Sequence, residues 1–262
     1  MDKETKELGA VARTLALGGT HHEVLRSRHD CIIFRVAPPD SASFIVKLWK
    51  RPGVRGFLRR ITQTGNLDRE WKTLNHLSRF ALAVPEAITR FHFDSPINGY
   101  TDAIVMQDIG VGVLGTEYLT QLLGQELKQG SADERIKFEN SVIELTASIL
   151  QAGVLDLDHH LVNMIVTPSG DIVRLDFEIS TIVRNPRRHT RKFAWVIANL
   201  MTSYIVAVNA HGKETANGFA MKLAKDLELP ANLLRHAKVK VEKNLESQQQ
   251  QSGLDLRWTP PW

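Results

Sequence analysis

Three polar residues between Leu155 and Glu178 have the types and spacing that metal-dependent phosphoryl transfer requires. Asp158 and Asn163 stand five residues apart in a polar segment, and Asp176 follows a segment that predicts a β-hairpin. Carboxylate and carboxamide oxygens are ligands that Mg²⁺ prefers, and a further carboxylate can orient an attacking hydroxyl group. Residues 155–178 are therefore the candidate catalytic loop.

Two charged residues outside this loop lie where charge is unfavourable. Lys47 lies in the apolar segment Ser43–Trp49, which predicts a strand, and Glu70 falls on the apolar face of a helix predicted over Asn66–Phe80. A buried carboxylate needs a cationic partner, and a lysine in such a strand needs an anionic one. We expect these two residues to pair. For Lys47 the alternative is a packed stem with its ammonium group in water.

The order of these residues resembles the motifs of the protein-kinase-like superfamily. A strand lysine comes first, followed by a helix glutamate, a D-x-x-x-x-N sequence and a D-F-x sequence. The resemblance implies that ATP and magnesium are the cofactors. It implies that Lys47 contacts the nucleotide phosphates and that Glu70 pairs with it. It also implies that Asp158 is the catalytic base and that Asn163 and Asp176 are the magnesium ligands.

More narrowly, the chain resembles the bacterial lipopolysaccharide core kinases, which phosphorylate Kdo or heptose. The resemblance rests on residues 44–60 (FIVKLWKRPGVRGFLRR), residues 69–77 (REWKTLNHL), and the sequence D-F-E at 176–178 directly before an arginine-rich segment. It implies a kinase that acts on a sugar hydroxyl of an anionic glycan or glycolipid. A kinase acting on protein or another small molecule, and a non-catalytic pseudokinase or binding module, are the alternatives.

The segment between the first two predicted strands departs from the kinase pattern because it contains no glycine. Arg26–Asp30 stands where kinases carry a glycine-rich loop, so we expect Arg28 to contact the nucleotide through its side chain. Gly18–Thr20 is a rival candidate for that loop. Gln107, in the connector after the last strand of the N-terminal half, is a further candidate nucleotide contact.

Asp156 stands two residues before Asp158, where kinases usually have a histidine. Its charge would either raise the pKa of Asp158 or face solvent, and the sequence leaves both open. Glu178, the third residue of the D-F-x triplet, resembles sugar-directed and small-molecule kinases more than protein kinases. We expect no metal site at His159 and His160, because adjacent side chains of an extended segment point in opposite directions.

The predicted elements change from mostly strands to mostly helices near residues 107–112. The predicted fold class is α+β, a two-lobed protein-kinase-like fold. An N-terminal antiparallel β-sheet lobe with one main helix covers residues 1–108, and a mostly helical lobe covers residues 109–262. Strands are predicted at 23–27, 31–36, 43–49, 87–93 and 103–106, and helices at 66–80, 117–127, 131–152, 188–209, 214–228 and 231–246.

Three details of the helical half are also predicted. Ser131 and Glu134 have the spacing of a capping box at the start of a helix. Residues 248–253 are expected to form a polar linker. Trp258 and Trp262 in the tail either pack back on the helices or form a hydrophobic anchor.

The composition of the chain limits its compartment. Among 262 residues there is one cysteine, Cys31, which excludes an intramolecular disulfide and a cysteine-built zinc site. The N-terminus has no pattern of a signal or transit peptide, and the longest apolar run, residues 193–208, is too short to span a bilayer. We therefore expect a cytoplasmic protein, with a peripheral position on the inner face of the membrane as a variant of that location.

Basic residues gather in two clusters, Lys47–Arg60 and Arg184–Lys192, although the formal net charge is only +4. Such clusters favour an anionic partner, whether a nucleotide, a nucleic acid, a phosphosugar or a membrane surface. Together with the resemblance above, they imply an anionic sugar or glycolipid substrate, or the membrane surface that carries it. We expect no nucleic acid, because no aromatic-studded sheet or recognition helix accompanies the clusters. The arginines expected to attract the substrate are Arg51, Arg55, Arg59, Arg60, Arg187, Arg188 and Arg191.

Overall fold

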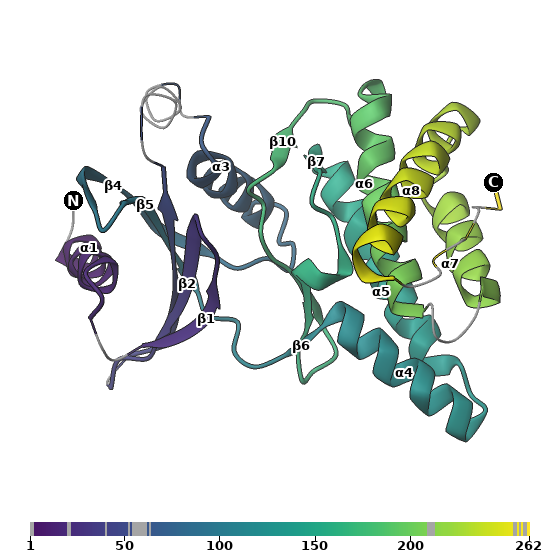
Figure 1. Ribbon diagram of the computed structural model, residues 1–262, viewed down its shortest axis with the longest axis horizontal. Helices are drawn as coiled ribbons and strands as arrows, with labels where there is room; N and C mark the ends of the chain where they lie inside the picture. Colours follow the sequence, from purple (N-terminus) through teal and green to yellow (C-terminus); the bar gives the residue numbers. More distant parts are fainter. Residues whose placement is uncertain are drawn as a thin grey trace. The chain divides into compact units, whose positions relative to one another are not determined.

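The computed structural model describes residues 3–19, 22–39, 41–51, 53, 62, 64–208, 213–253, 256, 258 and 261–262. Its contacts divide the chain into two compact units, Met1–Arg79 with Val84–Gly110 and Phe80–Ala83 with Val111–Trp262. The first unit is built mainly of strands and the second mainly of helices (Figure 1). Four residues named above, Thr20, Arg55, Arg59 and Arg60, lie outside the described residues.

The first unit is an antiparallel sheet whose strands follow the order β1-β2-β3-β5-β4. Its strands are rich in β-branched and aromatic residues, which fit a pleated and partly buried surface. The described elements are α1 (Lys3–Ala16), β1 (Glu23–Ser27), β2 (Cys31–Val36), β3 (Phe44–Lys50), α3 (Asn66–Ser78), β4 (Ala87–Ile97) and β5 (Tyr100–Gln107).

One face of this sheet packs against α1. Ala12 and Leu15 of the helix share a buried cluster with Val46 and Leu48 of β3. Because successive side chains of a strand point to opposite faces, Lys47 points away from this cluster. In register, Lys47 lies between Ile33 of β2 and Ile104 of β5, so its side chain projects from the middle of the other face of the sheet.

The second unit places short strands among packed helices. Its helices are α4 (Gly115–Gln129), α5 (Asp133–Gln151), α6 (Thr190–Val208), α7 (Lys213–Asp226) and α8 (Ala231–Ser252), with the 3₁₀ turns η1 (Leu161–Asn163) and η2 (Pro186–Arg188). Its strands are β6 (Val113–Leu114), β7 (Val154–Asp156), β8 (Met164–Val166), β9 (Ile172–Arg174) and β10 (Ser180–Ile182). The hairpin predicted after Asn163 is confirmed as β8 and β9, and β10 pairs with β7.

Helix α6 is the central helix of this unit. It contacts α4, α7 and α8, and most of its side chains are buried. The helix predicted over residues 188–209 is confirmed as Thr190–Val208. No described helix combines the length and hydropathy that crossing a membrane requires.

Three local expectations are wrong. Residues 248–252 continue α8 instead of forming a linker, and Gly253 ends the helix with a φ of 71°. Helix α5 begins at Asp133, whose amide donates to the Ser131 hydroxyl, while Glu134 pairs with Lys137 and closes no capping box. The glycine pair at 18–19 ends α1, because its amides bond to carbonyls of that helix; it is no loop between strands.

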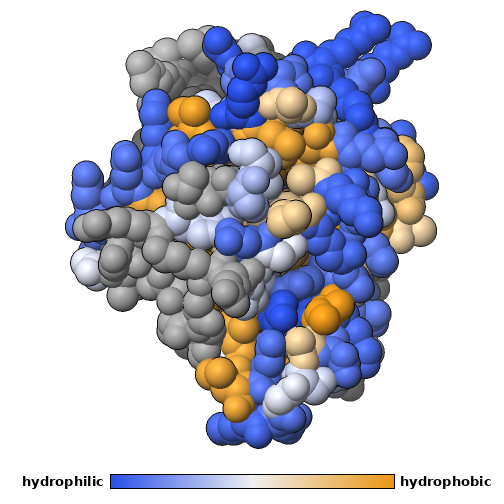
Figure 2. Space-filling view, turned by 90° about the vertical axis from the view of Figure 1, so that its right-hand side faces the viewer, coloured by the Kyte–Doolittle hydropathy of each residue, from blue (hydrophilic) through white to orange (hydrophobic). Residues whose placement is uncertain are grey.

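Trp258, near the C-terminus, packs on the second unit. Trp258 is buried, and its Nε1 donates to Oδ1 of Asn217 at 2.9 Å. Its ring meets that of Trp262 edge to face, with 6.4 Å between the centroids. These contacts favour packing over a hydrophobic anchor. The face that carries α7 and the C-terminus is mainly hydrophilic, with hydrophobic residues in separate patches (Figure 2).

Candidate active site

Lys47 and Glu70 form a buried ion pair within the first unit. Nζ of Lys47 donates to Oε2 of Glu70 at 3.0 Å and to Oε1 at 3.3 Å, and the residues are 2% and 1% exposed. Helix α3 presents Glu70 from its buried face, as its apolar spacing predicted. The pairing is confirmed, whereas the role of the pair toward a nucleotide stays a prediction.

Asp68 fixes helix α3 against the sheet, two residues before Glu70. It is 1% exposed, and its Oδ1 accepts from Nη1 of Arg90 on β4 at 2.7 Å. The Arg90 guanidinium also lies over the ring of Trp71, 5.6 Å from its centroid. Since Asp68 and Glu70 share one helix turn, this contact helps to hold Glu70 at Lys47.

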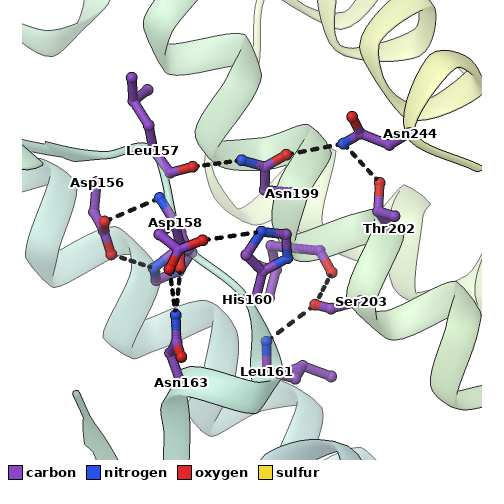
Figure 3. Close-up of polar contacts among 12 residues, drawn as sticks. Asp156, Leu157, Asp158, His160, Leu161, Asn163, Asn199, Thr202, Ser203 and Asn244 are labelled. Carbon is purple, nitrogen blue, oxygen red and sulfur yellow. Dashed lines mark hydrogen bonds and ion pairs between the residues drawn. The ribbon is translucent and has the colours of Figure 1, made fainter. Parts of the chain in front are cut away.

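Asp158 and Asn163 are joined side chain to side chain in the second unit (Figure 3). Nδ2 of Asn163 donates to Oδ2 of Asp158 at 2.9 Å and to the Asp158 carbonyl at 3.0 Å. Asn163 is buried, whereas the Asp158 side chain is 38% exposed. The carboxylate is therefore held in one orientation and still accessible. The amide nitrogen of Asn163 is engaged, so its oxygen is the atom suited to a metal ion.

Arg174 on β9 is hydrogen-bonded to several residues of this loop. Its guanidinium donates to the carbonyls of Asp158 at 2.7 Å and Asn163 at 3.0 Å, and to a carboxylate oxygen of Asp156. Arg174 and Asp156 are both fully buried. Such an arginine satisfies several acceptors in a fixed fork, which a lysine could not do.

Asp156 does not face solvent, so one of the two alternatives left open by the sequence is wrong. Its Oδ1 accepts the amide of Asp158 at 3.1 Å. Burial by itself would raise the pKa of Asp156, but the Arg174 charge, the contact with His159 and the Asp158 amide outweigh it and hold that pKa below its ordinary value. Asp156 is therefore a negative charge compensated by Arg174, and it orients the backbone of Asp158.

Two histidines beside Asp158 are held neutral by burial. Burial lowers the pKa of His159, which accepts from Nε of Arg174 at 3.4 Å and contacts the Thr146 hydroxyl at 2.9 Å. Burial also lowers the pKa of His160, whose Nε2 lies 3.4 Å from Oδ1 of Asp158. His159 packs inward with Thr146 and His160 contacts Asp158, so the two rings serve different partners.

Asp176 has a left-handed backbone, with a φ of 60°. A residue with a side chain rarely adopts this conformation, and such strain concentrates at functional sites. The amide of Leu175 donates to the Asn163 carbonyl at 2.8 Å, so the residue before Asp176 is hydrogen-bonded to Asn163. Phe177 is fully buried under Arg174, whose guanidinium lies 5.1 Å from the ring centroid.

Polar side chains of helix α6 also hold the catalytic loop by hydrogen bonds (Figure 3). Nδ2 of Asn199 donates to the Leu157 carbonyl at 2.6 Å, and the Ser203 hydroxyl accepts the Leu161 amide at 3.0 Å. Asn244 on α8 in turn donates to Oδ1 of Asn199 at 2.9 Å. The loop is thereby positioned by side chains whose groups are hydrogen-bonded.

Comparison with known proteins defines the fold. No family model matches the chain, and no curated protein matches it in sequence. The structure is similar to that of WaaP in complex with acyl carrier protein, with a TM-score of 0.63 and 16% identity over 93% of this chain and 98% of that one. It is also similar to the Toxoplasma gondii specific rhoptry antigen kinase domain, with a TM-score of 0.55 and 12% identity over 96% of this chain and 93% of that one.

The chain has a protein-kinase-like fold. The predicted α+β class, with an antiparallel sheet unit and a helical unit, is confirmed, and so is the protein-kinase-like fold that the resemblance implied. At these sequence identities the similarity is one of fold.

Within this kinase-like fold, the turn between β1 and β2 is short and contains no glycine. The Arg28 amide donates to the Cys31 carbonyl at 2.8 Å, which closes the turn, and the arginine is exposed. Gln107 is the last residue of β5 and is also exposed. Contact of either residue with a nucleotide stays a prediction.

The segment after β5 is fixed by Asp108, which sequence reasoning placed in a connector. Its carboxylate accepts from the Ser43 hydroxyl at 2.8 Å, from the Gly110 amide at 3.0 Å and from Nε of Arg35 at 2.9 Å. Burial opposes ionisation of Asp108, but these three partners outweigh it and lower its pKa. The connector is therefore attached to β2 and to the start of β3.

Sequence reasoning also missed Arg174, Asn199 and Ser203. Signals for all three were present: an arginine in the apolar segment Ile172–Leu175, and polar residues interrupting a buried helix. A buried polar side chain needs a partner, and here each partner is the backbone of the catalytic loop or its neighbours.

Proposed function

We propose that this chain is an ATP- and magnesium-dependent kinase that transfers the γ-phosphoryl group to a sugar hydroxyl of an anionic glycan or glycolipid such as the lipopolysaccharide core. The observation that carries the proposal is the Asp158–Asn163 contact. It leaves an oriented, accessible carboxylate beside an amide oxygen suited to Mg²⁺.

Each residue has a distinct role in this proposal. Lys47, held by Glu70, binds non-bridging phosphate oxygens. Asn163 and Asp176 hold magnesium, which when bound neutralises charge on the phosphates. Their amide and carboxylate oxygens are the hard ligands that this ion takes. Asp158 accepts the proton of the acceptor hydroxyl through Oδ1, which lies 3.4 Å from Nε2 of His160, while Oδ2 is engaged by Asn163.

The acceptor class rests on charge. From Arg184 to Val208 the chain has five arginines and lysines and no acidic residue. Arg187, Arg188 and Arg191 in this segment are exposed and would attract an anionic acceptor. We place this reaction on the cytoplasmic side of a membrane that supplies the glycolipid. By similarity to WaaP alone, acyl carrier protein is a further partner to test.

Two other functions compete with this proposal. A non-catalytic binding module is favoured by the glycine-free turn between β1 and β2. A kinase acting on proteins is disfavoured, because β10 begins four residues after Asp176 and leaves no room for a long activation segment.

Thermal unfolding with ATP and MgCl₂ separates a nucleotide-binding kinase from a module. A ligand bound only by the folded state stabilises it by about 2.7 kcal/mol at a concentration 100 times its Kd. We expect ATP with magnesium to raise the Tm of the full chain, and ATP with EDTA to raise it less. Equal Tm values with and without ATP would contradict nucleotide binding.

A further inference from the structure

Helices α6 and α8 enclose an open groove on the second unit, apart from the catalytic loop. The groove has a volume of about 760 Å³ and is lined by Arg191, Trp195, Arg235, His236, Val239, Lys240 and Lys243. All lining residues are basic, aromatic or apolar, and no carboxylate is among them. Because the groove is open to solvent and not an enclosed cavity, it suits a surface better than a buried small molecule.

Trp195 in this groove is unusually exposed to solvent for a large aromatic residue. The residues around it on α6, Phe193, Ala194, Val196 and Ile197, are buried, yet Trp195 is 44% exposed. Val239 on α8 also lines the groove and is 52% exposed. An indole ring with an apolar body and one polar N–H group is favoured at the boundary between lipid and water.

Cations surround this apolar centre. Nζ of Lys240 lies 5.1 Å from the centroid of the Trp195 ring, and Arg191, Arg235 and Lys243 line the same groove. Helix α6 contains no acidic residue, and α8 contains Glu242 and Glu246, neither of which lines the groove. The local charge is therefore strongly positive, as a surface bearing anionic phosphates requires.

We infer that the groove between α6 and α8 docks the protein on an anionic phospholipid bilayer, with Trp195 and Val239 entering the interface and the basic residues contacting lipid phosphates. Apolar side chains within a basic face are the combination that binds such surfaces. Only the purpose of docking rests on the proposed function: docking would bring the enzyme to a glycolipid acceptor. Docking itself requires neither ATP nor phosphoryl transfer.

Flotation of the full chain with vesicles, without nucleotide, tests the inference. We expect binding to vesicles of phosphatidylcholine with about one-third phosphatidylglycerol, and little binding to phosphatidylcholine alone. Lys240→Gln with Lys243→Gln should lower partitioning about 25-fold, since each basic residue near the surface contributes about fivefold. Lys128→Gln with Lys238→Gln is the matched control, because it removes the same charge outside the groove and should have a much smaller effect.

Trp195 gives an independent readout. Brominated lipids should quench the fluorescence of the wild-type chain, and Trp195→Phe should abolish that quenching while leaving the other four tryptophans in place. Equal losses of binding in the groove and control variants, or quenching unchanged by Trp195→Phe, would overturn the inference. No binding to anionic vesicles would also overturn it and would favour an acidic protein as the occupant.

Phosphorylation of a soluble acceptor should be unchanged in Lys240→Gln with Lys243→Gln, so failed docking and failed kinase function are distinguishable.

Discussion

Arg174 and Asp156 form a fully buried ion pair, and the same guanidinium holds the carbonyls of Asp158 and Asn163. The pair thus links β9, which leads to Asp176, to the loop that carries Asp158. Charges kept from water at this point serve to position two candidate catalytic segments.

Removing one member of this pair should be more harmful than removing both. Arg174→Met leaves Asp156 buried without its cation, and we expect a loss of about 3–5 kcal/mol in the free energy of unfolding. Arg174→Met with Asp156→Leu should recover part of this loss. Urea denaturation of the two variants and of wild type measures the difference. A double variant less stable than Arg174→Met would show that the pair does not account for the buried charge.

The buried histidine beside Arg174 should make stability depend on pH. Burial holds the pKa of His159 in the folded state below its ordinary 6.5. Between the two pKa values the unfolded state therefore binds a proton at His159 and the folded state does not. Stability is full above pH 6.5 and falls as pH decreases toward the folded pKa, by at most about 1.4 kcal/mol per pH unit for this group. His159→Gln should reduce the slope measured by denaturation between pH 7.5 and 5.

His160→Gln is the companion variant, because the pKa of His160 is also lowered by burial. Each single variant should remove the contribution of one histidine to the slope of stability against pH, and the double variant should remove both contributions. A slope unchanged in His159→Gln would contradict a neutral buried imidazole at this position.

The Ser203 hydroxyl should protect one specific amide of the catalytic loop. It accepts the Leu161 amide at 3.0 Å, so Ser203→Ala should leave this donor without its partner. Losing a hydrogen bond worth about 1 kcal/mol corresponds to roughly fivefold faster exchange of the Leu161 amide, measured by NMR. Ser148→Ala, whose hydroxyl bonds to the Glu144 carbonyl in α5, is the control. Equal exchange at Leu161 in all three proteins would argue against anchoring by α6.

Glu70 should matter for nucleotide binding through Lys47. In Glu70→Ala the lysine loses the carboxylate 3.0 Å away that holds its ammonium group, so we expect the rise in Tm caused by ATP and magnesium to shrink. Glu117→Ala removes an exposed carboxylate from the first turn of α4 and should leave the shift intact. If both variants keep the full shift, the pair has no part in binding ATP.

The sequence predicted those parts of the site whose signal is local. Lys47 and Glu70 were found because a charge interrupts an apolar pattern of known period. Asp158, Asn163 and Asp176 were singled out because their spacing is itself the motif, and their catalytic and metal-binding roles stay predictions. The α8 boundary was missed, since a polar glutamine run is equally compatible with an exposed helix end.

The supporting residues depend on contacts that no local pattern encodes. Arg174 meets Asp156 across 18 residues, and Asn199 meets Leu157 across 42. Buried polar side chains need hydrogen-bond partners, so the sequence indicates that partners exist. Only the packing of α6 and β9 on the loop shows which residues the partners are. The left-handed backbone of Asp176 could not be expected either, because aspartate adopts this conformation only occasionally and no local pattern marks this position for it.

The most direct test of the central claim is mass spectrometry of lipopolysaccharide core oligosaccharide after incubation with the full chain, ATP and MgCl₂. We predict that wild type adds a phosphate to the oligosaccharide. Asp158→Asn should add none, although ATP and magnesium still raise its Tm. Asp171→Asn, in the exposed β8–β9 turn, should act as wild type does. Phosphorylation by Asp158→Asn at the wild-type rate would contradict the assignment of Asp158 as the base.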